Sequence, residues 1–220
     1  MTRAVLFDLD GTLVDTRHDL ATSVNLALAE IGLPERRPAE IFGFIGEGAR
    51  RLVERAIAPH TDRIEPALAA WARHYDLHLL DRSRPFPGLA ELLGRLQGPL
   101  AVNTNKPGPM ARRLLEGLGL AAHFAYVVGG GDVEAHKPDP AGALAILARL
   151  GLPPEQAIYV GDSRIDVETA KRCGLRFVGV AWGLGGEREL REAGAREIVP
   201  NAEALERSLS PGNRSRPQER

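Results

Sequence analysis

The chain has 220 residues, of which 44% are hydrophobic and 26% charged, and its formal net charge is −1. This length allows one full-sized domain with a smaller insert, and the composition is that of an ordinary globular protein. The balanced charge gives no electrostatic reason to expect a nucleic-acid partner or binding to an anionic membrane. A single cysteine, Cys173, excludes an internal disulfide, and no apolar run reaches the roughly 18 residues of a membrane span. We therefore expect a cytoplasmic protein without a signal peptide.

Short apolar runs that end in polar or glycine-rich turns recur along the chain. They lack period-two alternation, which is typical of strands buried on both faces. The runs are Ala4–Leu9, Leu100–Thr104, Ala125–Gly129, Ala157–Gly161, Phe177–Ala181 and the weaker Glu197–Val199. Between them, residues 110–118 and 144–150 carry leucines at helical spacing, and each stretch is followed by glycine, a helix stop. This alternation predicts an α/β fold with a parallel sheet.

One region, between Thr16 and Arg84, shows no strand pattern. Three apolar stripes at helical spacing occupy residues 20–31, 52–57 and 68–79. Pro85-Phe86-Pro87-Gly88 marks the return to the alternating pattern. We therefore predict a core formed by residues 1–15 and 86–209 and an inserted cap of helices, residues 16–85, called the helical block below. The tail, residues 210–220, has no large apolar side chain and is predicted to be disordered.

The first predicted strand ends in Asp8-Leu9-Asp10-Gly11-Thr12. In open α/β sheets, ligands bind beyond the carboxyl ends of the strands. A simple turn explains Asp10 followed by Gly11. It does not explain Asp8, a charged residue inside an apolar run. The pair of carboxylates therefore indicates a functional site at the carboxyl edge of the sheet.

Further polar residues follow later strands. Thr104 and Asn105 end the second predicted strand, Lys137 lies in a loop stiffened by two prolines, and Asp162 is followed four residues later by Asp166. Each alone has an ordinary explanation: a strand-end residue, a solvated lysine, a helix N-cap. Their occurrence together after successive strands favours one shared catalytic site.

These motifs resemble those of the haloacid dehalogenase superfamily on its phosphatase branch. The matching positions run in order from Asp8-Leu9-Asp10-Gly11-Thr12 through Thr104, Lys137-Pro138 and Gly161-Asp162 to Asp166, and the resemblance extends over residues 4–205. It implies a Rossmann-like parallel sheet core with an all-helical cap inserted after the first strand. It also implies a Mg²⁺-dependent phosphomonoester hydrolase that forms a phosphoaspartate on Asp8.

The resemblance further implies a role for each residue of the motifs. Mg²⁺ would bind the carboxylates of Asp8 and Asp162 and the backbone carbonyl of Asp10, while Asp166 orients that site. A hard divalent cation with oxygen ligands suits a phosphate substrate surrounded by carboxylates.

The reaction itself would involve a second group of side chains. Asp8 would attack phosphorus, and Asp10 would act as general acid and then as general base. Thr104 and the amide of Asn105 would hold phosphoryl oxygens, and Lys137 would supply positive charge.

The segment Phe42–Leu52 within the helical block bears on the substrate. Gly46 and Gly48 permit close backbone approach, and free amides at a helix start favour an anion. A plain joint between two helices explains the same residues equally well. The segment resembles that of bacterial phosphoglycolate phosphatases, as do Asn105-Lys106-Pro107 and Ala181-Trp182-Gly183. A small carboxylate would suit these amides with Arg50 or Arg51, so we predict hydrolysis of 2-phosphoglycolate to glycolate.

Other functions stay open at this stage. Another small phosphate ester or pyrophosphate would serve the same core. A phosphomutase resembling beta-phosphoglucomutase is disfavoured, because Asp15–Leu20 lacks a histidine closely followed by an Ala-Trp pair. A binding module that kept the fold but lost activity is disfavoured because every catalytic position is present. The expected partner is a small phosphorylated metabolite, and the protein is expected to be a monomer or a homodimer.

Overall fold

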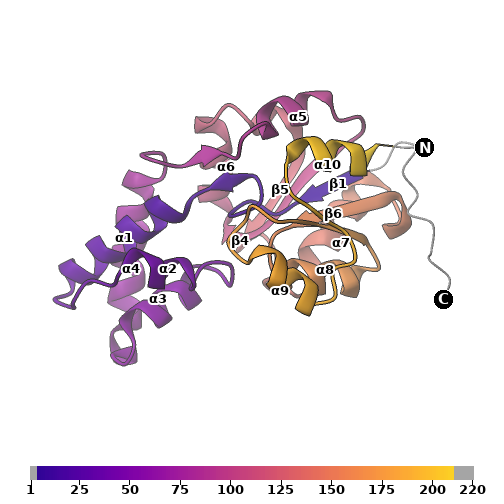
Figure 1. Ribbon diagram of the computed structural model, residues 1–220. Coiled ribbons are helices and arrows are strands. Elements are labelled where there is room, and N and C mark those ends of the chain that lie inside the picture. The colour runs from indigo at the N-terminus through magenta and orange to yellow at the C-terminus, as the bar shows by residue number, and fades with distance from the viewer. Residues whose placement is uncertain (1–3, 211–220) are drawn as a thin grey trace.

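The computed structural model describes residues 4–210 (Figure 1). Six strands form one parallel sheet in the order β5-β4-β1-β6-β7-β8. Their bounds are β1 Ala4–Phe7, β4 Leu100–Pro107, β5 Phe124–Gly130, β6 Ala157–Gly161, β7 Arg176–Val180 and β8 Ile198–Val199. All six predicted strands are present, so the expected α/β fold with a parallel sheet is confirmed.

Helices cover both faces of the sheet. Successive side chains of a strand point to opposite faces, and in β1 Val5 and Phe7 pack in one apolar cluster while Ala4 and Leu6 pack in another. The first cluster includes α5 (Leu89–Arg95), α6 (Gly108–Gly117) and α10 (Ala202–Leu209), and the second includes α7 (Ala141–Leu150) and α8 (Arg164–Cys173). A last helix, α9 (Gly186–Glu192), contacts α8 and β7. Burial on both faces explains why β1 lacks polar alternation.

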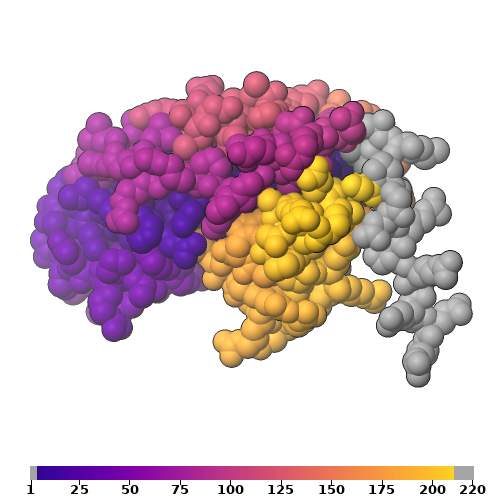
Figure 2. Space-filling model, turned by 45° about the horizontal axis from the view of Figure 1, so that its top comes forward, coloured from indigo at the N-terminus to yellow at the C-terminus, as the bar shows by residue number. Residues whose placement is uncertain are grey.

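The helical block lies beside one end of the sheet (Figure 1), and Figure 2 shows its indigo and purple surface directly against the rest of the protein. Its helices are α1 Arg17–Glu30, α2 Pro38–Phe42, α3 Ala49–Ile57 and α4 Ile64–His78. The chain enters the block through β2 (Val14–Asp15) and leaves it through β3 (Arg84–Pro85), and these two short strands pair antiparallel.

A buried carboxylate fastens this entry and exit. The Asp19 side chain, 1% exposed, accepts hydrogen bonds from the amides of Arg82 and Ser83 and from the Ser83 hydroxyl. Hydrogen bonds to an ionised acceptor are stronger than neutral ones. Asp19 therefore stabilises the place where the block joins the sheet domain.

Some elements differ from the prediction. Strand β4 was expected to end at Thr104 but continues to Pro107, because it pairs with β5 across a register shift between Asn103 and Pro107. The prediction missed the short strands β2 and β3 and the short helix α2. The predicted disordered tail lies, from residue 211 on, outside the described residues. Between residues 4 and 210 no helix combines the length and apolar character needed to cross a membrane.

Candidate active site

Strand β1 lies at the centre of the sheet, between β4 and β6, where the strand order reverses. Asp8 directly follows β1, and its amide donates to the carbonyl of Val160 in β6. Thr104 lies on β4, and Asp162 directly follows β6. Because parallel strands end at the same edge of a sheet, this topology brings the predicted residues of three strands together at the reversal point.

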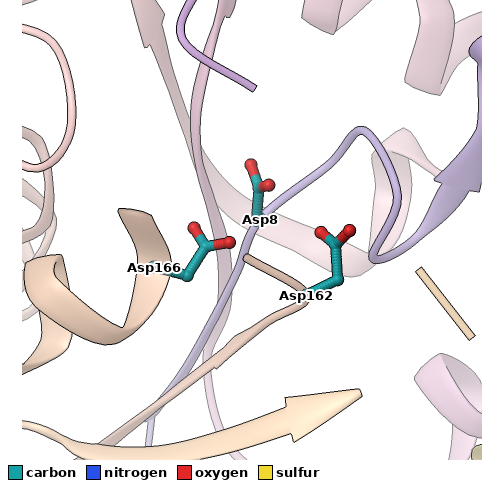
Figure 3. A group of neighbouring side chains, drawn as sticks. All are labelled: Asp8, Asp162 and Asp166. Atoms are coloured by element: carbon teal, nitrogen blue, oxygen red, sulfur yellow. The ribbon is translucent and has the colours of Figure 1, made fainter. Parts of the chain in front are cut away.

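Three buried carboxylates meet at this edge. Figure 3 shows Asp8, Asp162 and Asp166 turned towards a common space, and one oxygen from each lies within 4.8 Å of the others. Burial, followed by the charge of Asp166, raises the pKa of Asp8 to about 8 and that of Asp162 to about 7. Ionising these carboxylates together is therefore unfavourable unless cations lie beside them.

Lys137 supplies one of these cations. Its Nζ lies 2.7 Å from Asp8 Oδ1 and 2.7 Å from Asp166 Oδ1. Burial alone would lower the pKa of Lys137, but the carboxylates of Asp166 and Asp8 outweigh it and raise this pKa well above its usual value. The lysine therefore stays charged beside the carboxylate predicted to be the nucleophile.

Neighbouring groups hold the other two carboxylates in place. Asp166 Oδ2 accepts hydrogen bonds from the Ser163 amide and hydroxyl, and Ser163 is the N-cap of α8. The alternative explanation of Asp162 as this helix cap is therefore wrong. Asp162 instead accepts from Thr12 Oγ1 at 2.9 Å and from the Leu184 amide at 2.7 Å. Thr12, which stands in the first motif, was not among the predicted site residues.

Gly11 allows Asp162 to come this close to the loop after β1. Its φ of +91° is a conformation that residues with a side chain rarely adopt. A Cβ at this position would also collide with the Asp162 carboxylate. The glycine of the first motif is therefore required both by the turn and by the packing of the carboxylate cluster.

The donor set fits a divalent cation. Four aspartates of the site, residues 8, 10, 162 and 166, face two ammonium groups, those of Lys106 and Lys137. Two positive charges would balance the excess, and carboxylate oxygens are the ligands that Mg²⁺ prefers. Asp166 uses Oδ1 for Lys137 and Oδ2 for Ser163, whereas the contact of Asp8 with Lys137 involves Oδ1 alone.

Asn105 connects the core to the helical block. Its Oδ1 accepts from the Lys137 amide at 2.8 Å, and its Nδ2 donates to the carbonyls of Lys137 and Gly46, each at 3.1 Å. The role expected for Asn105 was phosphate binding through its backbone amide. The structure adds a role for its side chain, which orders the loop that carries Lys137.

Asp10 reaches into a cavity between the sheet edge and the helical block. Its Oδ1 accepts from Thr16 Oγ1 at 2.6 Å and from Lys106 Nζ at 2.8 Å. The cavity has an empty volume of about 420 Å³, which includes space open to solvent. Its lining includes Asp8, Asp10, Gly46, Gly48, Trp71, Tyr75, Thr104, Asn105 and Lys106. Lys106, Trp71 and Tyr75 were given no role in the site by sequence reasoning.

The residues predicted for substrate specificity fall into two groups. Gly46 and Gly48 line the cavity. Arg50 pairs with Glu65, and Arg51 pairs with Glu54, both on the exposed side of the block. The structure therefore brings the two glycines to the site but leaves both guanidinium groups outside the cavity lining.

Comparisons with known proteins agree with this fold and site. Residues 5–180 match the family model described as "Haloacid dehalogenase-like hydrolase". The chain is 36% identical to a phosphoglycolate phosphatase of Escherichia coli K12 over 206 residues, 82% of each chain. It is 36% identical to phosphoglycolate phosphatase 1 of Pseudomonas aeruginosa over 93% of this chain and 79% of that protein.

A solved structure shows the same architecture. The crystal structure described as a predicted phosphoglycolate phosphatase from Haemophilus somnus superposes with a TM-score of 0.90, at 29% identity, over 95% of this chain and 98% of that one. The expected family and fold are thereby confirmed. The chain belongs to the haloacid dehalogenase-like hydrolase family, as one of its phosphatases.

Proposed function

We propose that this protein hydrolyses 2-phosphoglycolate to glycolate and phosphate, with Mg²⁺ bound and with a phosphoaspartate formed on Asp8. The observation that carries the mechanism is the position of Asp8 at the centre of the carboxyl edge, 2.7 Å from Lys137 and beside Asp162 and Asp166. The relatives named phosphoglycolate phosphatase support the substrate.

Mg²⁺ would be held by the carboxylates of Asp8 and Asp162 and by the backbone carbonyl of Asp10. When bound, it would supply the positive charge that lets a phosphate dianion approach several aspartates. Asp166 would orient this site through its contacts with Lys137 and Ser163.

The chemistry then follows from the side chains. One oxygen of Asp8 contacts Lys137, and the other attacks phosphorus as the bond to the ester oxygen breaks. Asp10 gives its proton to the departing oxygen. Asp10 next takes a proton from water, which attacks phosphorus and breaks the bond to Asp8. Thr104, the amide of Asn105 and Lys137 stabilise the charge spread over the phosphoryl oxygens.

The helical block would act as the cap that covers this reaction and selects the substrate. Its segment around Gly46 and Gly48 lines the cavity, and the side chain of Asn105 donates to the Gly46 carbonyl. Closure of such a block excludes water from the reacting groups.

A substrate screen tests the proposal. The purified full chain is assayed with 2-phosphoglycolate, para-nitrophenyl phosphate, sugar phosphates and pyrophosphate, with Mg²⁺ and with a chelator. We expect chelator-sensitive phosphate release with the highest kcat/KM for 2-phosphoglycolate. Equal turnover of the other esters would refute the substrate, and activity that survives complete removal of metal would refute the role of Mg²⁺.

A further inference from the structure

A group of hydrogen-bond donors lies in the cavity next to Asp10, and the mechanism above does not use it. Its members are Trp71 and Tyr75 on α4 and Lys106 on β4, called the donor cluster below. All three side chains line the cavity although they come from the helical block and from the sheet domain. Lys106 of this cluster lies 2.8 Å from Asp10, the residue proposed to protonate the leaving group.

Trp71 carries the strongest sign of a missing ligand. The residue is 2% exposed, and its Nε1 is the one buried side-chain nitrogen or oxygen between residues 4 and 210 without a hydrogen-bond partner. An indole N–H can only donate, and burying it unpaired costs free energy. An acceptor bound in the cavity that Trp71 lines would satisfy this donor.

Tyr75 and Lys106 add donors to the same place. The Tyr75 ring stacks on Trp71, with 5.2 Å between ring centroids, and its hydroxyl accepts a hydrogen bond from Lys106 Nζ at 2.5 Å. Burial, followed by the charge of Asp10, raises the pKa of Tyr75 well above its usual value, so the hydroxyl keeps its proton. The ammonium group of Lys106 has three N–H bonds, and two of them donate to Asp10 and Tyr75.

Helix α3 adds to the positive character of the cavity. It begins at Ala49 after Gly48, whose φ of +89° suits glycine, and both residues line the cavity. The first-turn amides of a helix have no partner within the helix and attract anions. The lining of the cavity therefore combines side chains of α4 and β4 with the first turn of α3, together with the charge of Lys106.

We infer that the donor cluster and the first turn of α3 bind a carboxylate on the leaving group of the substrate. This inference rests on the proposed function and names its specificity residues. In 2-phosphoglycolate one methylene separates the departing oxygen from the carboxyl carbon. Asp10 protonates that oxygen, and Lys106 Nζ lies 2.8 Å from Asp10, so the carboxylate would lie beside Lys106. Trp71, Tyr75 and Lys106 thus take the place first predicted for Arg50 and Arg51.

The test compares two esters that differ only in the group proposed to be bound. The substrates are 2-phosphoglycolate and 2-hydroxyethyl phosphate, in which a neutral hydroxymethyl group replaces the carboxylate. The quantity measured is the ratio of their kcat/KM values with Mg²⁺. Trp71→Phe and Tyr75→Phe each remove one donor and keep an aromatic ring. Each should lower this ratio roughly tenfold, mainly through KM for 2-phosphoglycolate, because each loses one hydrogen bond to a charged group.

Trp182→Phe is the matched control. This substitution also removes an indole N–H. In the wild type, however, the N–H of Trp182 has a partner, the Thr12 carbonyl at 3.1 Å. The ratio of the two kcat/KM values should stay at the wild-type value in Trp182→Phe, even if the substitution lowers stability. Inhibition by glycolate gives a second measurement, and its inhibition constant should rise in Trp71→Phe and Tyr75→Phe alone.

The outcomes separate the two proposals. If the wild type prefers 2-phosphoglycolate but Trp71→Phe and Tyr75→Phe keep the wild-type ratio, the donor cluster is refuted and the proposed function stands. If the wild type hydrolyses both esters equally, the carboxylate preference and the donor cluster both fail, while a general phosphatase remains. If Trp71→Phe does not fold, Tyr75→Phe, which removes a single oxygen, decides the question.

Discussion

The two sides of the catalytic cavity have opposite chemistry. At the sheet edge, the buried carboxylates of Asp8, Asp162 and Asp166 lie together, and Lys137 contacts two of them. Under the helical block, Trp71, Tyr75 and Lys106 offer donors. The contact of 2.8 Å between Asp10 and Lys106 joins the two sides. The acidic side suits a metal ion and nucleophilic attack on phosphorus. The donor side suits an anionic leaving group. Substitutions on the two sides should therefore affect the reaction and the recognition of the substrate separately.

The largest expected effect comes from the acidic side. Asp8→Asn removes the nucleophile and should reduce turnover of every phosphate ester by roughly 10⁴-fold or more. The measurement is kcat with 2-phosphoglycolate and with para-nitrophenyl phosphate. Asp81→Asn, on an exposed aspartate that pairs with His78, is the control and should keep wild-type kcat. Substantial turnover of either ester by Asp8→Asn would rule out the phosphoaspartate.

Lys137→Ala should have the next largest effect. Loss of its charge beside Asp8 and the phosphoryl group should lower kcat by roughly 10²- to 10³-fold. The loss should be equal for esters with and without a carboxylate, which distinguishes Lys137 from the donor cluster. Lys171→Ala, at an exposed lysine 4.0 Å from Glu168, is the matched control. A selective loss for 2-phosphoglycolate would instead place Lys137 in leaving-group recognition.

The acidic side should also destabilise the metal-free protein as the pH rises. In the unfolded chain Asp8 loses its proton near its usual pKa of 3.8, whereas in the folded protein it holds the proton until about pH 8. The folded state therefore binds more protons between these values, and the free energy of unfolding should fall from pH 4 to pH 8. Asp162, with a pKa raised to about 7, acts in the same direction.

Urea unfolding in a chelator at pH 5 and pH 8 measures this effect. The free energy of unfolding of Asp8→Asn should fall less between these pH values than that of the wild type. At pH 8 the variant should be more stable than the wild type by ~2 kcal/mol. This gain is smaller than the pKa shift of Asp8 implies, because Lys137 loses a charged partner. Asp81→Asn should follow the wild type. If the free energy of unfolding falls by the same amount in Asp8→Asn as in the wild type, groups other than Asp8 cause the fall.

The smallest expected effect concerns Arg50 and Arg51. Their guanidinium groups pair with Glu65 and Glu54 on the exposed side of the helical block. Arg50→Ala and Arg51→Ala should each change KM for 2-phosphoglycolate by less than about twofold, since exposed ion pairs contribute little. A rise in KM of tenfold or more would restore the role first predicted for them and would weaken that of Lys106.

The acidic side was predictable from sequence because its residues follow strands. Asp8, Thr104 and Asp162 stand at or near the ends of short apolar runs, and a parallel sheet necessarily brings those ends to one edge. Lys137, in its loop with two prolines, and Asp166, four residues after Asp162, also stood out in the sequence, but their roles came from the motif resemblance. The structure places both in the cluster. That Mg²⁺ binds here stays a prediction.

The donor side could not be read in this way. Tyr75 and Trp71 belong to the apolar stripe of a helix, and a stripe of that kind normally marks core packing. The contact that places the Tyr75 hydroxyl in a polar site comes from Lys106. Lys106 lies on β4, which is distant in sequence from α4 and belongs to the sheet domain. Arg50 and Arg51 were chosen for their charge, but α3 buries Leu52 and Val53 and turns the arginines outward.

The narrow join between β2 and β3 has an evolutionary consequence. The helical block leaves and rejoins the sheet domain at one antiparallel pair, Val14–Asp15 with Arg84–Pro85, fastened by Asp19. An insertion of this kind can be replaced or remodelled as a unit without breaking a strand of the parallel sheet. A lineage can therefore acquire new substrates by changing the insert while it inherits the hydrolytic machinery intact. In the laboratory, chimeras cut at these two strands are the natural way to exchange specificity between members of the family.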